Sequence, residues 1–397
     1  MRRILFITLA AVLAVSFSLI GCAPDGGEES IVIGIANAES GWIAAYELPA
    51  RQAAILKIEE INAAGGLLGH QLEYVTADTK TDSAEAVRAA QRVLEDDPVM
   101  VIMSSDFDLG AAQALELNDA GVVTFSPGST DANLGVAGDF LFSMGAVSQA
   151  EGFNMAEYAF EELCNGNKTA YVLVDTTTQY TEDVGAGFVA RWEELGGVIV
   201  GEDTFQNDDP SFSSQVTGVT SLPEEPEIIA VCSYPPGGAS LIRDLRSAGV
   251  ESTIMGDAVF DGDYWLDAVP DLSNFYYPAL LSLFGNETDP AKAEVMSNFA
   301  AKYGEEPEVG DYIYGYSIVE AWALAVERAG TFEPAAVVEE LEKFDHETLT
   351  VGNTTYTSEL HITRMRAMMI MNIEGGEHSA LGYFVSDEEP SMELLFG

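Results

Sequence analysis

Polar and aromatic residues gather where the predicted strands of this sequence end, and their types suit the binding of a small charged solute. In an open parallel sheet, ligands bind beyond the carboxyl ends of the strands. Small residues there expose backbone N–H groups to an anion, aromatic rings form apolar walls, and a carboxylate can pair with an ammonium group. The residues that we expect to bind ligand are Trp42, Tyr46, Asp106, Phe107, Asp108, Gly128, Ser129, Thr130, Tyr180, Tyr234 and Asp257.

These residue types are also ordinary turn and cap residues, so each segment taken alone is better explained by local structure. Only their joint placement at strand ends favours a binding site. One part of such a site would hold a carboxylate while the acidic residues hold an amine. A small molecule with both groups is an amino acid.

The sequence carries none of the common catalytic signatures. It contains no G-x-x-x-x-G-K-[ST], no G-x-S-x-G and no H-E-x-x-H, and its glycines do not form G-x-G-x-x-G. Its four histidines are scattered, and no cysteine pair has metal-ligand spacing. We therefore expect no enzyme, no metal and no cofactor. We expect Cys164 and Cys232 to be buried free thiols, with a disulfide as the alternative in an exported protein.

The elements that must position these residues alternate between short apolar strands and amphipathic helices. The first series begins at Ile31 and runs to Phe125, and a second series with the same rhythm begins at Thr169 and runs to Gly256. Such alternation specifies parallel sheets with helices on both faces. We predict an α/β fold of two doubly wound parallel-sheet lobes. The last third contains three helices and a late hairpin that turns at 374–377, so the chain should return to both lobes.

The N-terminus has the layout of an export signal. Arg2 and Arg3 precede an apolar run that ends in Gly21-Cys22, and a polar stretch follows. This resembles a lipoprotein signal, in which the cysteine becomes the lipid-bearing N-terminus. We predict a signal peptide over 1–21, lipidation of Cys22 and a tether over 22–30. The alternatives are an ordinary signal peptide with a chance cysteine, or an uncleaved anchor.

The net charge of −48 arises from 65 acidic against 17 basic residues. Such a surface repels nucleic acid and anionic lipid headgroups, so we expect no nucleic-acid partner and contact with the membrane only through the lipid anchor. The acids are spread along the chain, which favours adaptation to high salt over an acidic surface that only aids solubility.

Several segments together resemble the branched-chain amino-acid binding proteins of ABC importers. They span about Ile31 to Glu377 and are Ser40–Tyr46, Ile61–Leu72, Gly121–Thr130, Ala248–Asp257 and Tyr356–His361. The resemblance implies the type I periplasmic binding fold, with two lobes, three crossovers and hinged closure. It implies a first lobe of 31–146 and 281–348, and a second of 147–280 and 349–397.

The resemblance also assigns roles. Tyr46, Tyr180 and Tyr234 would wall the pocket, Gly128 and Thr130 would hold carboxylate and ammonium, and Asp257 would face the amine. Two positions depart from the family pattern. Phe107 stands where the family often has serine, and Asp257 directly follows Gly256, whereas the family acid comes one residue later, where this chain has Ala258.

We therefore expect an exported monomeric binding protein that carries an amino acid, or a related carboxylate or amide, to ABC permease subunits. A ligand-sensing receptor module on the same fold is the alternative, although this sequence ends at Gly397 without a signalling segment. Urea, amides and aromatic acids remain alternative ligands.

Overall fold

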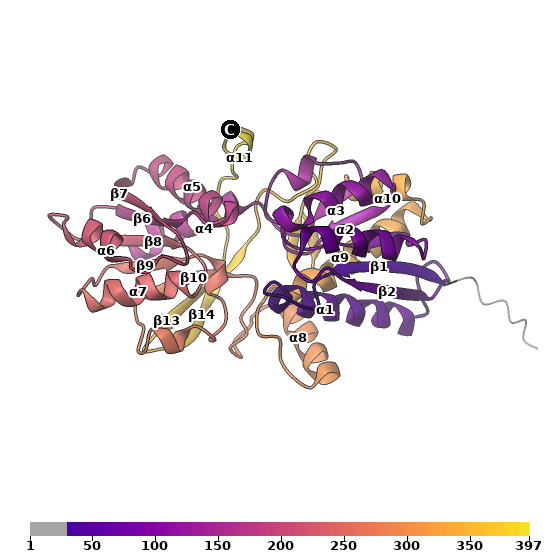
Figure 1. Ribbon diagram of the computed structural model, residues 1–397, viewed down its shortest axis with the longest axis horizontal. Helices are drawn as coiled ribbons and strands as arrows, with labels where there is room; N and C mark the ends of the chain where they lie inside the picture. Colours follow the sequence, from indigo (N-terminus) through magenta and orange to yellow (C-terminus); the bar gives the residue numbers. More distant parts are fainter. Residues whose placement is uncertain (1–29) are drawn as a thin grey trace, which may run out of the picture.

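The computed structural model describes residues 30–397, so the predicted signal peptide, Cys22 and nearly all of the tether lie outside the described residues. The described chain folds into two α/β lobes that lie side by side (Figure 1). This arrangement confirms the predicted fold class.

The first lobe is built on a five-stranded sheet in the order β2-β1-β3-β4-β5, with every neighbouring pair parallel. Its strands are β1 (Ile31–Asn37), β2 (Leu72–Asp78), β3 (Met100–Ile102), β4 (Val123–Ser126) and β5 (Leu141–Ser143). Its helices are α1 (Ala44–Ala63), α2 (Ser83–Leu94), α3 (Phe107–Asp119), the single turn η1 (Leu134–Val136), α8 (Pro290–Tyr303), α9 (Tyr312–Ala329) and α10 (Pro334–Leu341). A small hairpin of β11 (Glu347–Leu349) and β12 (Gly352–Thr354) completes it.

Helices cover both faces of this sheet. On one face, α1, α8, α9 and α10 bury the larger core, which includes Ile33, Ile35, Phe125 and Trp322. On the other face, α2 and α3 pack against a smaller, alanine-rich core. The alternation of apolar residues along β1 explains this division, because successive side chains of a strand point to opposite faces.

The second lobe has a seven-stranded sheet in the order β14-β13-β10-β9-β8-β6-β7. Its strands are β6 (Thr169–Asp175), β7 (Val198–Phe205), β8 (Ile228–Cys232), β9 (Thr253–Gly256), β10 (Phe275–Ala279), β13 (Met368–Glu374) and β14 (Glu377–Phe384). Its helices are α4 (Ser148–Tyr158), a π turn η2 (Ala159–Leu163), α5 (Gln179–Glu194), α6 (Ser213–Thr220), α7 (Gly237–Ser247), the single turns η3 (Ala258–Phe260) and η4 (Leu266–Ala268), and α11 (Met392–Phe396).

This second sheet is parallel from β7 to β10, whereas β13 and β14 join it antiparallel. The predicted turn lies as expected, because Glu374 pairs with Glu377 at the end of the hairpin. Cys164 and Cys232 are both buried free thiols, as predicted.

The chain crosses between the lobes three times. The first crossing follows β5, and the second follows β10, after which Leu281 lies in the core of the first lobe. The predicted third boundary at residue 349 is wrong, because Val351 and Tyr356 are still buried in that first core. The chain leaves it near Thr363, which pairs with Ala146 of the first crossing, so two of the three connections lie side by side.

Candidate functional site: the cleft between the lobes

A cavity of about 150 Å³ lies between the two lobes, with walls from both. The predicted ligand-binding residues line it, with one exception. Those that line it are Trp42, Tyr46, Asp106, Phe107, Asp108, Gly128, Ser129, Thr130, Tyr180 and Tyr234. Trp42 is 63% exposed and therefore lies at the rim. Phe107 also borders the outer part of the cleft and packs partly on the smaller core of the first lobe.

Asp257 is the exception, because the structure does not place it at the cavity surface, where its predicted role at the ligand amine requires it. Its side chain is fully buried and does not line the cavity. Burial and the neighbouring carboxyl of Glu151 raise the pKa of Asp257 well above its ordinary value, which favours the neutral acid. A fully buried carboxyl that does not line the cavity cannot reach the ammonium group of a ligand there.

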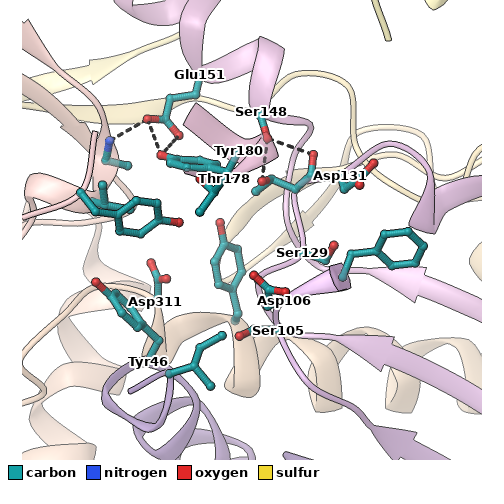
Figure 2. Close-up of a pocket in the computed structure, with 18 of the residues that line it drawn as sticks. Tyr46, Ser105, Asp106, Ser129, Asp131, Ser148, Glu151, Thr178, Tyr180 and Asp311 are labelled. Carbon is teal, nitrogen blue, oxygen red and sulfur yellow. Dashed lines mark hydrogen bonds between the residues drawn. The ribbon is translucent and has the colours of Figure 1, made fainter. Parts of the chain in front are cut away.

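Glu151, in the first turn of α4, lines the cavity instead. Its Oε1 accepts a hydrogen bond of 2.6 Å from the backbone N–H of Ala258, and the hydroxyl of Tyr180 lies 3.0 Å from both carboxylate oxygens (Figure 2). Ala258 stands where the family resemblance places an acid. The carboxyl of Glu151 therefore lies beside this position although its backbone belongs to another element.

Close packing of α4 against α5 brings Glu151 and Tyr180 together. A Cβ atom on Gly152 would collide with the backbone of Val184 and Phe188, and one on Gly187 would collide with the backbone of Gln149. The two glycines thus permit the helix backbones to touch. The sequence analysis did not identify α4 or β5. Every residue of α4 from Ser148 to Glu157 is buried, so the helix shows no polar face from which its period could be recognised.

The loop after β4 offers hydroxyl groups on the opposite side of the cavity. Ser129 is 3% exposed, and its hydroxyl has no hydrogen-bond partner among the described residues. Ser148 donates a 2.7 Å hydrogen bond to Oγ1 of Thr130, which leaves the Thr130 hydroxyl hydrogen free to donate elsewhere. These groups suit a ligand oxygen such as that of a carboxylate.

Glu47 is a buried acid that the sequence analysis missed, and it fixes the first-lobe wall. Its carboxylate accepts hydrogen bonds from Ala38, from the Ser104 hydroxyl and from both the N–H and the hydroxyl of Ser105. Desolvation raises the pKa of Glu47, while these hydrogen bonds oppose the rise. Since Glu47 ties the loop after β1 to the loop after β3, it holds the strand ends that carry the site.

The sequence analysis also missed Glu151 and two other acids near the cavity, Asp261 and Asp311. Burial raises the pKa of Glu151 to about 7, that of Asp261 to about 7 and that of Asp311 to about 6. Asp261 accepts hydrogen bonds from Gly262 and, across the cleft, from Gly310 at 2.9 Å. Asp311 directly precedes α9 and has no capping hydrogen bond from its side chain. Neither acid follows a strand, so strand-end reasoning could not have found them.

No group of three or more His, Cys, Asp or Glu side chains that could hold a metal occurs within residues 30–397. In the same part of the chain, no helix is both long enough and apolar enough to cross a bilayer.

Two α/β lobes that enclose a solute-sized cavity are typical of solute-binding proteins. The sequence of residues 30–377 matches the family of periplasmic binding proteins, and the chain belongs to that family. The chain is accordingly a solute-binding protein of that family rather than an enzyme.

Similar proteins include two from Pseudomonas aeruginosa. The chain is 27% identical to an amino acid binding protein, over 80% of this chain and 84% of that one. It is 26% identical to a leucine-, isoleucine-, valine-, threonine- and alanine-binding protein, over 82% and 85%.

Solved structures of the same fold bind different solutes. The branched-chain amino acid transporter substrate-binding protein LivJ from Streptococcus pneumoniae, in complex with isoleucine, superposes with a TM-score of 0.74 at 25% identity, covering 91% of this chain and all of that one. A solute-binding protein from R. palustris in complex with benzoate superposes with a TM-score of 0.71 at 15% identity, covering 91% and 98%.

Proposed function

We propose that this chain is an exported, lipid-anchored binding protein that captures one α-amino acid between its lobes and delivers it to an ABC importer. The observation that carries the proposal is Glu151, a buried carboxylate that lines the cavity opposite a loop with free hydroxyl groups. An ammonium group and a carboxylate on one small molecule satisfy both features.

In this arrangement the ligand ammonium pairs with Glu151, and the carboxylate accepts hydrogen bonds from Ser129 and Thr130. The rings of Tyr46, Tyr180 and Tyr234 form the apolar walls. Because these groups come from both lobes, binding and hinge closure are coupled. Similarity to proteins named for amino-acid binding supports the same ligand class.

The alternative ligands fit the cavity less well. An aromatic acid such as benzoate has a carboxylate and no amine, so it would leave Glu151 without a cationic partner. Urea and simple amides carry no cation either. A receptor module would bind ligand in the same way, and it would differ only in its partner.

Export and anchoring are proposed from the N-terminal signal, with Cys22 as the lipidated residue and ABC permease subunits as the partner. The rest of the chain would lie in the periplasm or at the outer face of the cytoplasmic membrane, as a monomer.

A ligand screen tests the proposal. Thermal shift with the common amino acids, simple amides, urea and benzoates should show stabilisation by one group of amino acids only. Titration calorimetry of that group should give one site per chain. Stabilisation by benzoates or amides, with none by any amino acid, would overturn the proposed ligand class.

A further inference from the structure

Asp311 is an acid of the cavity wall whose side chain pairs with no other described residue. It lies in the cavity beside Tyr46, and its side chain makes no hydrogen bond or ion pair within residues 30–397 (Figure 2). Burial alone accounts for its raised pKa, with no opposing hydrogen bond. An unpaired acid that is partly buried in a cavity is unfavourable unless a ligand group pairs with it.

The other acids of the cavity wall mostly have local partners. Asp106 caps α3 through Leu109, Asp131 caps the turn at Asn133, Asp183 accepts from Gln179, and Asp261 holds Gly262 and Gly310. Asp108 is exposed at the rim of the cleft. Asp311 is therefore the inner acid whose oxygens remain available.

The charge of the cavity wall also favours a positively charged group on the ligand. Seven of its residues are acidic, and none of the described lining residues is Lys, Arg or His. An amino acid with a neutral side chain would neutralise one acid with its amine, but its own carboxylate would add a negative charge to the cavity. A second positive group on the ligand offsets this excess of negative charge.

Three groups of the cavity lie where they could contact three different ends of a bound solute. In Figure 2, Ser129 lies on the right, Asp311 and Tyr46 lie on the left, and Glu151 lies above Asp311. We propose that the ligand is an α-amino acid whose side chain ends in an amine or guanidinium group, and that this cation pairs with Asp311. This inference rests on the proposed function, with the α-ammonium at Glu151 and the carboxylate at Ser129 and Thr130.

The two acids also belong to different lobes. Glu151 stands on α4 of the second lobe, Asp311 precedes α9 of the first, and the charge of Asp311 disfavours ionisation of Glu151. Two cationic groups between them convert this repulsion into attraction as the lobes approach. The hydrogen bond from Gly310 to Asp261 of the second lobe holds the residue next to Asp311 at the closed cleft.

Matched ligands test the proposal directly. L-norleucine has the carbon chain of L-lysine without the side-chain amine. Calorimetric titrations should be done in 1 M salt, where the Debye length is about 3 Å and nonspecific attraction to the acidic surface is screened. L-lysine, L-ornithine or L-arginine should bind at least about tenfold more tightly than L-norleucine and L-leucine, since a hydrogen bond between charged groups corresponds to roughly ten- to a hundredfold in affinity.

Variants of Asp311 test whether this residue causes the preference for cationic amino acids. Asp311→Asn should weaken binding of the cationic amino acid by about ten- to a hundredfold and leave norleucine unchanged or tighter. Asp311→Leu should reverse the preference in favour of norleucine. Glu308→Gln, an exposed acid three residues earlier, is the control and should change neither ligand. Circular dichroism establishes that each variant is folded.

The outcomes separate the two proposals. Tight binding of leucine or norleucine with weak binding of all three cationic amino acids would overturn the role of Asp311 and leave the proposed function intact. Equal losses for lysine and norleucine in Asp311→Asn would overturn it as well. If no α-amino acid binds and a diamine such as cadaverine does, the proposed function fails while the pairing of a cation with Asp311 stands.

Discussion

The backbone N–H of Ala258 donates a 2.6 Å hydrogen bond to Oε1 of Glu151, although 107 positions separate the two residues in the chain. Ala258 occupies the position where the family resemblance expects an acid. The chain thus places a carboxylate at this position from α4, and the acid that is nearest in sequence, Asp257, lies buried behind it.

Replacing Glu151 with glutamine should therefore weaken binding of the amino-acid ligand by about ten- to a hundredfold, because the ammonium loses a charged partner. A desamino analogue that keeps the carboxylate should bind equally to both forms. Titration calorimetry gives both affinities. Asp257→Asn should change neither of them, and Glu161→Gln, an exposed acid just beyond α4, is the matched control. A larger loss in Asp257→Asn than in Glu151→Gln would restore the original assignment.

Gly152→Ala should destabilise the second lobe. The added methyl group meets the backbone of Val184 and Phe188 in α5, and forced overpacking costs about 1–3 kcal/mol of unfolding free energy. Ala186→Ser, on the exposed side of α5, should have little effect. Denaturant unfolding monitors both variants. Since the same packing aligns Glu151 with Tyr180, ligand affinity should fall in Gly152→Ala as well; wild-type stability and affinity together would contradict the packing argument.

Affinity for the amino acid should rise from pH 5 to pH 8, because Glu151, with a pKa near 7, and Asp311, with a pKa near 6, must ionise to hold a cation. Calorimetry at each pH measures this. Affinity that falls over this range would exclude acids of raised pKa as the partners of the ligand.

The stability of the ligand-free protein should change in the opposite direction. An acid whose pKa is raised in the folded state binds its proton more tightly there than in the unfolded chain. Its contribution to stability is therefore complete below its unfolded pKa, which is 4.5 for Glu151, and is lost as the pH rises through about 7. Thermal denaturation at pH 5 and pH 8 should show a smaller decrease in Glu151→Gln than in the wild-type protein.

Salt should stabilise the fold. With a net charge of −48, repulsion between surface acids should weaken as the Debye length shrinks from about 10 Å at 0.1 M to about 3 Å at 1 M salt. The melting temperature should rise over this range in chloride salts. A flat or falling melting temperature would favour the simpler explanation of an acidic surface that only aids solubility.

Lipidation should be visible at the mature N-terminus. Mass spectrometry of protein purified from membranes should find a diacylglyceryl group on Cys22 and no residue before it. Cys22→Ser should release the protein from the membrane fraction. A mature chain that starts at another residue would show that the signal belongs to a different export route.

The sequence predicts this fold well where elements have one polar face. Helix α2 of the predicted first series is an example, because Asp82 caps it and its apolar residues recur on one side. The strand-end loops also lie around the cavity as expected, since parallel strands bring their carboxyl ends to one edge. Glu151 and Asp311 escaped prediction for a physical reason. The first stands on a helix that is buried on all sides, and the second enters the cavity from the loop between α8 and α9, which follows no strand.

Glu151, Tyr180 and Ala258 all belong to the second lobe, so their mutual distances do not depend on how far the lobes are apart. Under the proposed function, an incoming ammonium group would therefore meet a binding position that is already assembled in the open protein, and the encounter would need no prior rearrangement. Hinge closure then adds the wall of the first lobe behind a solute that is already bound. Changes to the hinge should accordingly alter how slowly the solute leaves far more than how fast it arrives.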